Sequence, residues 1–287
     1  MTDSIHTKVE TTKEKSLRMN KNVYEIRHDV DWSHTMNIKT KWKFNKKKRY
    51  LEPKKDAFCV NIISKETASM LIELAEQRGF EDAGYNKDYR SNTRIMTYDP
   101  MLTKALYPRI KQVCPSTYNI NGEIWDIHGL NPLCRWSKYT QGQKFDKHCD
   151  YNYFKSESEQ SLYTVNIYLN GNETYNGGKT RFYDRIDDYT YKLSSETSPF
   201  PGKALIFNHE PMKYTHDGEI LTSKNNSNII PVKYLWRTDV IYIKRKIKSI
   251  SIIDDLLLKF SKIYNDTKIE NINEQSLNRV SQWKWKD

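Results

Sequence analysis

The sequence predicts an α+β fold, in which a jelly roll or barrel of short strands is braced by helices on one side. Two segments with helical periodicity come before Pro115. After Pro115, short segments that alternate apolar and polar residues are separated by clusters of Gly, Asn and Pro. Many short strands after two helices are typical of a closed β architecture. The 287 residues suffice for one large domain with a sizeable core.

The elements before Pro115 are a strand and two helices. The apolar run AFCVNII, residues 57–63, predicts the strand. Ser64 is a suitable N-cap for the first helix, and Gly79 is a suitable end for it. The buried face of this helix is predicted by the spacing of Ala68, Leu71, Ile72 and Ala75. The second helix, from about Asp99 to Val113, repeats this spacing with Leu102, Ala105, Leu106, Ile110 and Val113.

The clearest strand after Pro115 is SLYTVNIYLN, residues 161–170. Side chains alternate between the two faces of a strand. One face therefore carries Tyr163, Val165, Ile167 and Leu169, and the other carries Leu162, Thr164, Asn166 and Tyr168. Further strands are predicted at GKALIF (202–207), YLW (234–236) and DVIYI (239–243).

The two ends of the chain differ from the middle, which predicts three parts: residues 1–50, 51–245 and 246–287. The first part is polar and basic, and its cluster Lys46–Arg49 is either a nucleic-acid or localisation patch or, more simply, a solvated loop. The last part holds one amphipathic helix, residues 252–264, and a polar end. These ends either cap the core, bind a partner or lack order.

Charge and cysteine content limit the class of protein. The net charge of +11 suits an acidic partner, such as nucleic acid or an acidic polypeptide, or simply keeps a Lys-rich protein soluble. No signal peptide and no membrane span are expected, so no membrane partner is predicted. The four cysteines lack disulfide-like or CxxC spacing, which predicts reduced thiols in an intracellular, cytoplasmic protein. The bias towards Lys, Asn, Ile and Tyr would fit a viral or lower-eukaryotic source with an AT-rich genome.

The segment KFDKHCDYNYF places His148 and Asp150 two residues apart in what reads as a strand. On a strand, both side chains would lie on one face and offer a nitrogen and an oxygen to a single metal ion. Two histidines and one carboxylate suit non-haem Fe(II) and leave positions open for other ligands. His216 is preferred over His209 as the second histidine. Arg237 follows it and is suited to gripping a carboxylate in a bidentate manner.

Motifs in the right order between about Arg90 and Arg245 resemble the 2-oxoglutarate- and Fe(II)-dependent oxygenases of the prolyl 4-hydroxylase-like group. The motifs are SNTR (91–94), HGLNPLCRWSKYTQGQKFDKHCD (128–150), TVNIYLN (164–170) with NGGKTRF (176–182), PGKALIFNH (201–209), HDGE (216–219) and KYLWRTDVIY (233–242). Any one of them is weak evidence, but six in order are strong evidence. The resemblance covers a little over half of the chain.

The resemblance implies a double-stranded β-helix core and an iron site made by His148, Asp150 and His216. It further implies that Arg237 pairs with the distal carboxylate of 2-oxoglutarate. Tyr139 and, as the weaker candidate, Thr164 would contact the same cosubstrate. The implied cofactors are Fe(2+), 2-oxoglutarate and O2, with L-ascorbate as a further candidate. The implied reaction couples decarboxylation of 2-oxoglutarate to succinate with hydroxylation of a substrate.

The chain departs from the family pattern in two respects. Collagen-type members usually carry Lys at the place assigned to Arg237. The segment between His216 and Arg237 is also longer than usual, and SKNNSN (223–228) reads as a polar insertion between strands.

Several neighbouring residues are expected to be structural. Cys149 would point away from the metal ligands into the core, Trp236 would pack in the core, and Gly177-Gly178 would form a turn. Asp146 and Asp217 would each serve a turn.

The substrate is less well defined by the sequence than the reaction. A prolyl residue in a protein or peptide is the first hypothesis, and the positive charge would suit an acidic one. Alternatives on the same fold are an oxygenase for nucleic acid or for a small molecule, or a non-catalytic scaffold, because fold alone does not fix function. The sequence does not predict the oligomeric state.

Overall fold

The computed structural model describes residues 23–25, 57–173, 175–210, 213–224, 229–246 and 259–260. The chain divides into two compact units, Met1–Arg245 and Lys246–Asp287, and the first holds all the elements discussed below. The basic cluster 46–49 lies outside the described residues, as does the C-terminal helix expected at 252–264, except for residues 259–260. The boundaries expected at residues 50 and 245 remain predictions. No helix within the described ranges is both long enough and apolar enough to cross a membrane.

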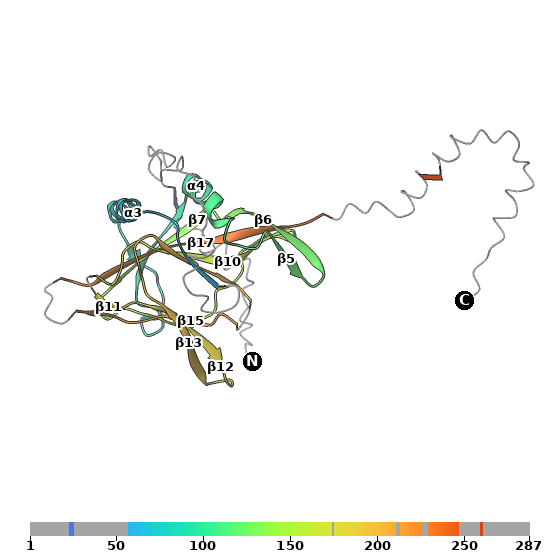
Figure 1. Ribbon diagram of the computed structural model, residues 1–287. Helices are drawn as coiled ribbons and strands as arrows, with labels where there is room; N and C mark the ends of the chain where they lie inside the picture. The colour runs from blue at the N-terminus through green and yellow to red at the C-terminus, as the bar shows by residue number, and fades with distance from the viewer. Residues whose placement is uncertain are drawn as a thin grey trace, which may run out of the picture. The chain divides into compact units, whose positions relative to one another are not determined.

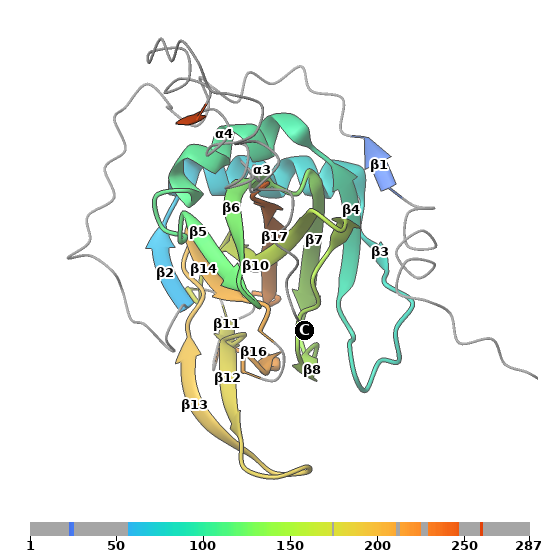
Figure 2. The ribbon, with the colours of Figure 1, turned by 90° about the vertical axis from the view of Figure 1, so that its right-hand side faces the viewer.

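A large sheet runs through the centre of the first unit (Figure 1). Its strand order is β1-β4-β7-β17-β10-β14-β2 (Figure 2). Its path is formed by β1 (Val23–Glu25), β4 (Thr93–Tyr98), β7 (Leu133–Thr140), β17 (Val232–Lys244), β10 (Glu159–Tyr168), β14 (Lys203–Asn208) and β2 (Ala57–Asn61). The pairs on this path are antiparallel, except that β1 pairs with β4 in parallel. Additional strands extend it: β3 (Glu81–Asp82), β5 (Thr117–Ile120), β6 (Glu123–Leu130) and β9 (Phe154–Ser156).

A second, smaller sheet lies on the side of the large sheet opposite the helices (Figure 2). Its order is β13-β12-β15-β8, formed by β8 (Phe145–His148), β12 (Thr180–Arg185), β13 (Tyr191–Thr197) and β15 (His216–Gly218). A separate two-stranded ladder joins β11 (Tyr175–Gly177) and β16 (Leu221–Ser223). Two facing antiparallel sheets make the double-stranded β-helix, so the predicted α+β fold class is confirmed.

Two helices brace the outer face of the large sheet, as the sequence predicts (Figures 1 and 2). Helix α3 (Lys65–Arg78) begins after Ser64, whose hydroxyl accepts a hydrogen bond from the backbone of Thr67, and it ends at Gly79. Helix α4 (Pro100–Ile110) begins after Asp99, which caps Leu102 in the same way. It ends three residues before the expected end, because the chain turns after Ile110.

The two faces of β10 enter different surroundings. Tyr163, Val165, Ile167 and Leu169 pack into the main core with the buried side chains of α3 and α4. Tyr168, on the other face, belongs to a second cluster between the sheets, together with Phe182 and Phe207. Leu162 is an exception, since it joins the main core; the register of β10 against β17 shifts between Ser161 and Tyr163.

Two expectations about strands are corrected. The strands expected at 234–236 and 239–243 are one continuous strand, β17, because Arg237 and Thr238 pair with β10 and leave no break. The strand that carries His148 ends at that residue, so Asp150 lies beyond the strand. The chain leaves the small sheet here and turns to the large one, where the backbone N–H of Tyr153 donates to Oγ of Ser161 on β10 at 2.8 Å.

Candidate active site

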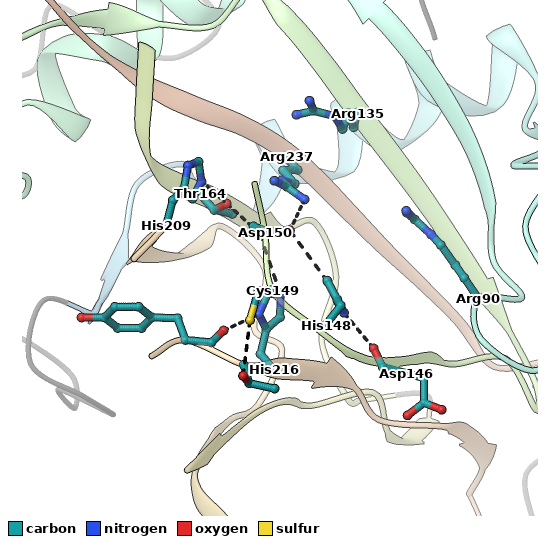
Figure 3. A network of polar contacts seen from close by, with 12 residues as sticks. Arg90, Arg135, Asp146, His148, Cys149, Asp150, Thr164, His209, His216 and Arg237 are labelled. Carbon is teal, nitrogen blue, oxygen red and sulfur yellow. Dashed lines mark hydrogen bonds and ion pairs between the residues drawn. The ribbon is translucent and has the colours of Figure 1, made fainter. Parts of the chain in front are cut away.

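Three side chains with metal-binding atoms meet between the two sheets. The ligand atoms of His148, Asp150 and His216 all lie within 4.8 Å of one another. Nε2 of His148 is 3.8 Å from Oδ1 of Asp150, and Nε2 of His216 is 3.9 Å from its Oδ2. Figure 3 shows both imidazoles directed towards the same carboxylate. This is the only such cluster of three among the described residues.

Strand pairing brings the two histidines together across a long sequence separation. Strands β8 and β15 are antiparallel neighbours in the small sheet, and His148 and His216 are direct Cα partners in their ladder. Direct cross-strand partners have side chains on the same face. Asp150 reaches the same point from the segment that follows β8, so the three ligands do not depend on strand alternation alone.

The hydrogen bonds of the histidines leave the Nε2 atoms free. Nδ1 of His148 donates to the backbone carbonyl of Asp146 at 2.7 Å, and Nδ1 of His216 donates to the carbonyl of Tyr214 at 2.9 Å. A carbonyl oxygen only accepts, so Nδ1 carries the proton and Nε2 keeps its lone pair. Burial and the adjacent His216 lower the pKa of His148 to about 3, and burial lowers the pKa of His216 as well. Both rings are therefore neutral, as metal ligands must be.

Asp150 is buried yet ionised. Burial alone would raise its pKa, but the charge of Arg237 and the neighbouring histidines bring the pKa below its ordinary value. Nη1 of Arg237 donates to Oδ1 of Asp150 at 2.6 Å, and the Thr164 hydroxyl donates to Oδ2 at 2.7 Å. These two partners fix the orientation of the carboxylate.

His209 lies behind this carboxylate and outside the metal-binding cluster. Its Nε2 is 2.8 Å from Oγ1 of Thr164. Because the Thr164 hydroxyl already donates to Asp150, it accepts from His209, and Nε2 of His209 therefore carries a proton. The structure thus brings together His216, and not His209, with His148 and Asp150. Thr164 contacts Asp150 and is absent from the cavity lining, where the sequence had suggested a cosubstrate contact.

A cavity of about 350 Å³ opens above the three ligands. Tyr139 and Arg237, the two residues that the sequence assigns to the cosubstrate, line it together with the three ligands. Further lining residues are Tyr85, Tyr89, Arg90, Arg94, Arg135, Ser137, Phe145, Cys149, Tyr151, Asn166, Thr180, Asp217, Gly218, Lys233 and Leu235. The cavity is therefore rich in aromatic and cationic side chains.

The two cations on the cavity face of β17 have different partners. Arg237 is bound to Asp150 and also donates from Nη2 to Oδ1 of Asp239 at 3.3 Å. Lys233 is only 3% exposed and has no carboxylate within ion-pair distance in the described part of the chain. Burial lowers its pKa to about 8. Its Nζ donates to the backbone carbonyl of Gly178 at 2.5 Å.

Lys233 is the residue that sequence reasoning missed. It lies on the same strand face as Arg237, and a Lys at the cosubstrate position is the pattern of collagen-type relatives. The family preference for Lys at the cosubstrate position could therefore have directed attention to Lys233. A buried ammonium without an anionic partner is costly and suits a carboxylate ligand, whereas Arg237 already has two carboxylates.

Two glycines with positive φ lie at the end of β11, and Gly178 is next to the side chain of Lys233. Gly177 and Gly178 have φ values of 73° and 67°, which other residues rarely adopt. A Cβ at Gly177 would lie 2.2 Å from the backbone oxygen of Ile220. Gly177 is the last residue of β11, and Gly178 leads towards β12, whose first residue, Thr180, lines the cavity.

Three structural expectations near the ligands are wrong. Asp146 lies within β8 instead of a turn. Cys149 lines the cavity instead of entering the core, with its Sγ 3.3 Å from Oγ1 of Thr215, because the chain is no longer a strand after His148. Asp217 lies within β15 and serves an ion pair instead of a turn. Its carboxylate accepts from Nε and Nη2 of Arg181 at 2.9 and 2.6 Å. Trp236 is fully buried in the main core, as predicted.

Comparison with known proteins gives a family match and several similar structures. Residues 134–235 match the family described as the 2OG-Fe(II) oxygenase superfamily. No curated protein matches the chain. The viral collagen prolyl hydroxylase vCPH of Paramecium bursaria Chlorella virus-1, in complex with 2OG, is 14% identical with a TM-score of 0.45, over 66% of this chain and 97% of that one.

Two further solved structures are similar at the same level. A Pseudomonas putida prolyl-4-hydroxylase is 12% identical, over 66% of this chain and 93% of that one, with a TM-score of 0.42. The structure titled OsALKBH1 is 15% identical, over 67% of this chain and all of that one, with a TM-score of 0.45. The matched segment contains His148, Asp150 and His216. The family match confirms the resemblance drawn from the motifs, and residues 134–235 carry it. A 2OG-Fe(II) oxygenase uses Fe(2+), 2-oxoglutarate and O2.

Proposed function

We propose that the protein is a dioxygenase that hydroxylates a prolyl residue in a protein or peptide while converting 2-oxoglutarate to succinate and CO2. One observation carries this proposal: two neutral imidazoles and one ionised carboxylate converge in a cavity that also holds Lys233, a buried cation with no carboxylate within ion-pair distance among the described residues. The family match supports the reaction class. The prolyl part is supported by the likeness of the sequence motifs to the prolyl 4-hydroxylase-like group.

The residues fit the implied metal. His148, Asp150 and His216 would hold Fe(II) through two nitrogens and one carboxylate oxygen, the donor set of non-haem iron oxygenases. Bound iron would supply the activation of dioxygen, with 2-oxoglutarate as the co-reductant. Arg237 and Thr164 keep Asp150 in place from behind. The backbone carbonyls at Asp146 and Tyr214 keep both imidazoles in the correct tautomer.

The cosubstrate would occupy the cavity between the metal site and Lys233. Lys233 is the residue that we assign to the distal carboxylate, in place of Arg237. Tyr139 lies beside it, with Nζ of Lys233 5.2 Å from the ring centroid. Thr180 carries a further hydroxyl in the cavity and accepts a hydrogen bond from Tyr168 at 2.7 Å. L-ascorbate is proposed only as a reductant that keeps the iron in the ferrous state.

The test is the release of succinate from 2-oxoglutarate, measured with Fe(II) in the presence and absence of a proline-rich peptide. The proposal predicts that the peptide stimulates succinate release and that its proline gains the mass of one oxygen. Both effects should be lost in Asp150→Ala. Asp146→Ala is the matched control, because its carboxylate lies outside the ligand cluster. Turnover that ignores the peptide would redirect the search to nucleic acid or small molecules. No turnover and no retained iron would leave a scaffold.

A further inference from the structure

Two arginines of the cavity lining, Arg90 and Arg94, carry charges that no carboxylate in the described residues neutralises. Nε of Arg90 donates to the neutral amide oxygen of Asn92 at 2.7 Å, and its guanidinium lies 4.3 Å from the ring centroid of Phe145. Arg94 lies over the Tyr85 ring at 5.7 Å. Burial and the charge of Arg90 lower the pKa of Arg94 to about 10. The chain holds two like charges together, which is unfavourable unless a ligand brings an anion.

The cavity lining as a whole also has an excess of positive charge. The five cationic side chains of the lining are Arg90, Arg94, Arg135, Lys233 and Arg237. The two carboxylates are Asp150 and Asp217. In the proposed function, the two charges of Fe(II) and the two carboxylates of 2-oxoglutarate cancel. The excess of positive charge in the lining therefore remains after both have bound.

Contacts, and not the net charge, distinguish Arg90 and Arg94 from the other three cations of the lining. Arg135 and Arg237 both pair with the buried Asp239, and Lys233 is taken by the distal carboxylate of the cosubstrate in the proposed function. Two arginines are therefore left for the substrate. A guanidinium binds a carboxylate through parallel N–H donors. The guanidinium groups of Arg90 and Arg94 share the Tyr85 ring, at 5.2 and 5.7 Å from its centroid.

The loops around these arginines do not extend the positive charge into a stripe. Lys87, between Tyr85 and Tyr89, is ion-paired with Asp82. Lys144, next to Phe145, lies 3.6 Å from the carboxylate of Asp146. Nucleic acid is bound by rows of cations that follow successive phosphates. A single localised pair of arginines fits one acidic group better than a polyanion.

The aromatic side chains at the mouth indicate what surrounds that acidic group. Tyr151 is 85% exposed and Tyr89 is 39% exposed, and both line the cavity. Exposed tyrosines give rigid apolar surface with little loss of conformational entropy, and aromatic-lined grooves accept proline-rich segments. The mouth therefore combines a surface for a peptide with a site for one carboxylate.

We propose that Arg90 and Arg94 together bind an acidic side chain of the substrate peptide, close in sequence to the residue that is hydroxylated. This inference rests on the proposed function in that it takes a peptide as the substrate. Tyr89 and Tyr151 pack against the residues that flank the acidic one. The protein then selects its substrate in two ways. The arginines recognise an acidic side chain at the mouth, and the cavity accepts the residue that is hydroxylated.

The test measures binding of two fluorescent peptides to the full-length protein loaded with Mn(II) and 2-oxoglutarate. One peptide alternates proline and glutamate, and the other alternates proline and glutamine. The wild type should bind the glutamate peptide about ten- to a hundredfold more tightly at low salt, the range of charge-assisted hydrogen bonds. Arg90→Gln and Arg94→Gln should reduce this preference to about threefold or less, whereas Arg94→Lys should retain part of it. Arg78→Gln, on the outer helix α3, removes the same charge away from the cavity and should preserve the preference.

Each alternative outcome is informative. Equal binding of both peptides by the wild type would overturn the inference. So would a loss of 2-oxoglutarate affinity in the arginine variants with the glutamate preference unchanged, which would assign the arginines to the cosubstrate. A single-stranded oligonucleotide that displaces the glutamate peptide at lower concentration would favour nucleic acid instead. A retained glutamate preference without any succinate release would support the binding site and overturn the proposed function alone.

Discussion

The two faces of the large sheet share one backbone ladder but perform different tasks. On the helix side, β10 and β17 present Val165, Ile167 and Trp236 to the buried side chains of α3 and α4. On the other face, the same two strands present Thr164, Lys233 and Arg237, of which Figure 3 shows Thr164 and Arg237. The apolar face supplies burial free energy without geometric demands. On the polar face, burying charged side chains in fixed positions costs free energy, and the burial of the apolar face offsets this cost.

Removal of a ligand on the cavity side should have the largest effect on activity. His216→Ala removes an imidazole nitrogen from the cluster of three. We expect loss of iron binding and more than a hundredfold loss of succinate release, measured by metal analysis and turnover. His209→Ala is the matched control. It removes a partner behind Asp150, and such partners are worth about 10- to 100-fold in metal affinity. Equal loss of iron in both variants would contradict the assignment of His216.

A change on the helix side should affect stability and leave the site intact. Leu106 is fully buried in the core between α4 and the sheet. Leu106→Ala should lower the free energy of unfolding by about 2–5 kcal/mol through lost burial and the cavity left behind. The control is Met101→Ala in the same helix, which is 54% exposed and should change stability by about 0.5 kcal/mol or less. Denaturant unfolding measures both, and KM for 2-oxoglutarate should be unchanged in the folded fraction of each variant.

The helix side was readable from the sequence because its rules are local. The spacing of Leu102 and Leu106 predicts a buried helix face, and Ser64 and Gly79 predict helix ends, without knowledge of distant partners. The alternation along β10 predicted both of its faces, except where the register shift moves Leu162. These features depend on neighbours within one or two turns of the chain.

The cavity side was readable only in part, because its contacts join distant segments. His148, Asp150 and His216 were selected by residue type and order, and the structure brings the three together. The assignment of Arg237 to the cosubstrate rested on residue type alone, and no local rule shows that Asp150 and Asp239 already occupy this side chain. The chain also leaves the small sheet after His148, and Tyr153 then bonds to Ser161 on another strand. No local rule predicts this exit, which changes the position of Cys149.

Lys233 and Arg237 provide a test within the cavity side. Lys233→Met should raise KM for 2-oxoglutarate by about 10- to 100-fold, because a charge-assisted contact is lost and a carboxylate is left without a partner. Arg237→Met should instead lower metal affinity, since Asp150 loses the donor that orients it. Initial rates over a range of 2-oxoglutarate and iron concentrations separate the two effects. A higher KM for 2-oxoglutarate in Arg237→Met alone would restore the assignment made from the sequence.

The pKa of Lys233 predicts how cosubstrate use depends on pH. Burial lowers this pKa to about 8 in the free protein, so the ammonium loses its proton above that pH while an unfolded lysine keeps it up to about 10.5. kcat/KM for 2-oxoglutarate should therefore fall above pH 8, approaching tenfold per pH unit. Since the unfolded state binds more protons in the window from 8 to 10.5, stability contributed at this site rises with pH there. Lys233→Arg should shift the fall in kcat/KM to higher pH, and an unshifted profile would assign the transition to another group.

Thr164 should give the smallest effect, and it tests whether support behind the ligands differs from contact with the cosubstrate. Thr164→Val keeps the shape of the side chain but removes the donor to Asp150 and the acceptor for His209. We expect a loss of about 1 kcal/mol in stability and a drop of about tenfold in metal affinity, with KM for 2-oxoglutarate unchanged. Thr164→Ser keeps the hydroxyl and should behave like the wild type in iron titrations. A raised KM for 2-oxoglutarate at unchanged metal affinity would mean that this hydroxyl contacts the cosubstrate, as the sequence suggests, and that the supporting layer behind Asp150 is formed by Arg237 alone.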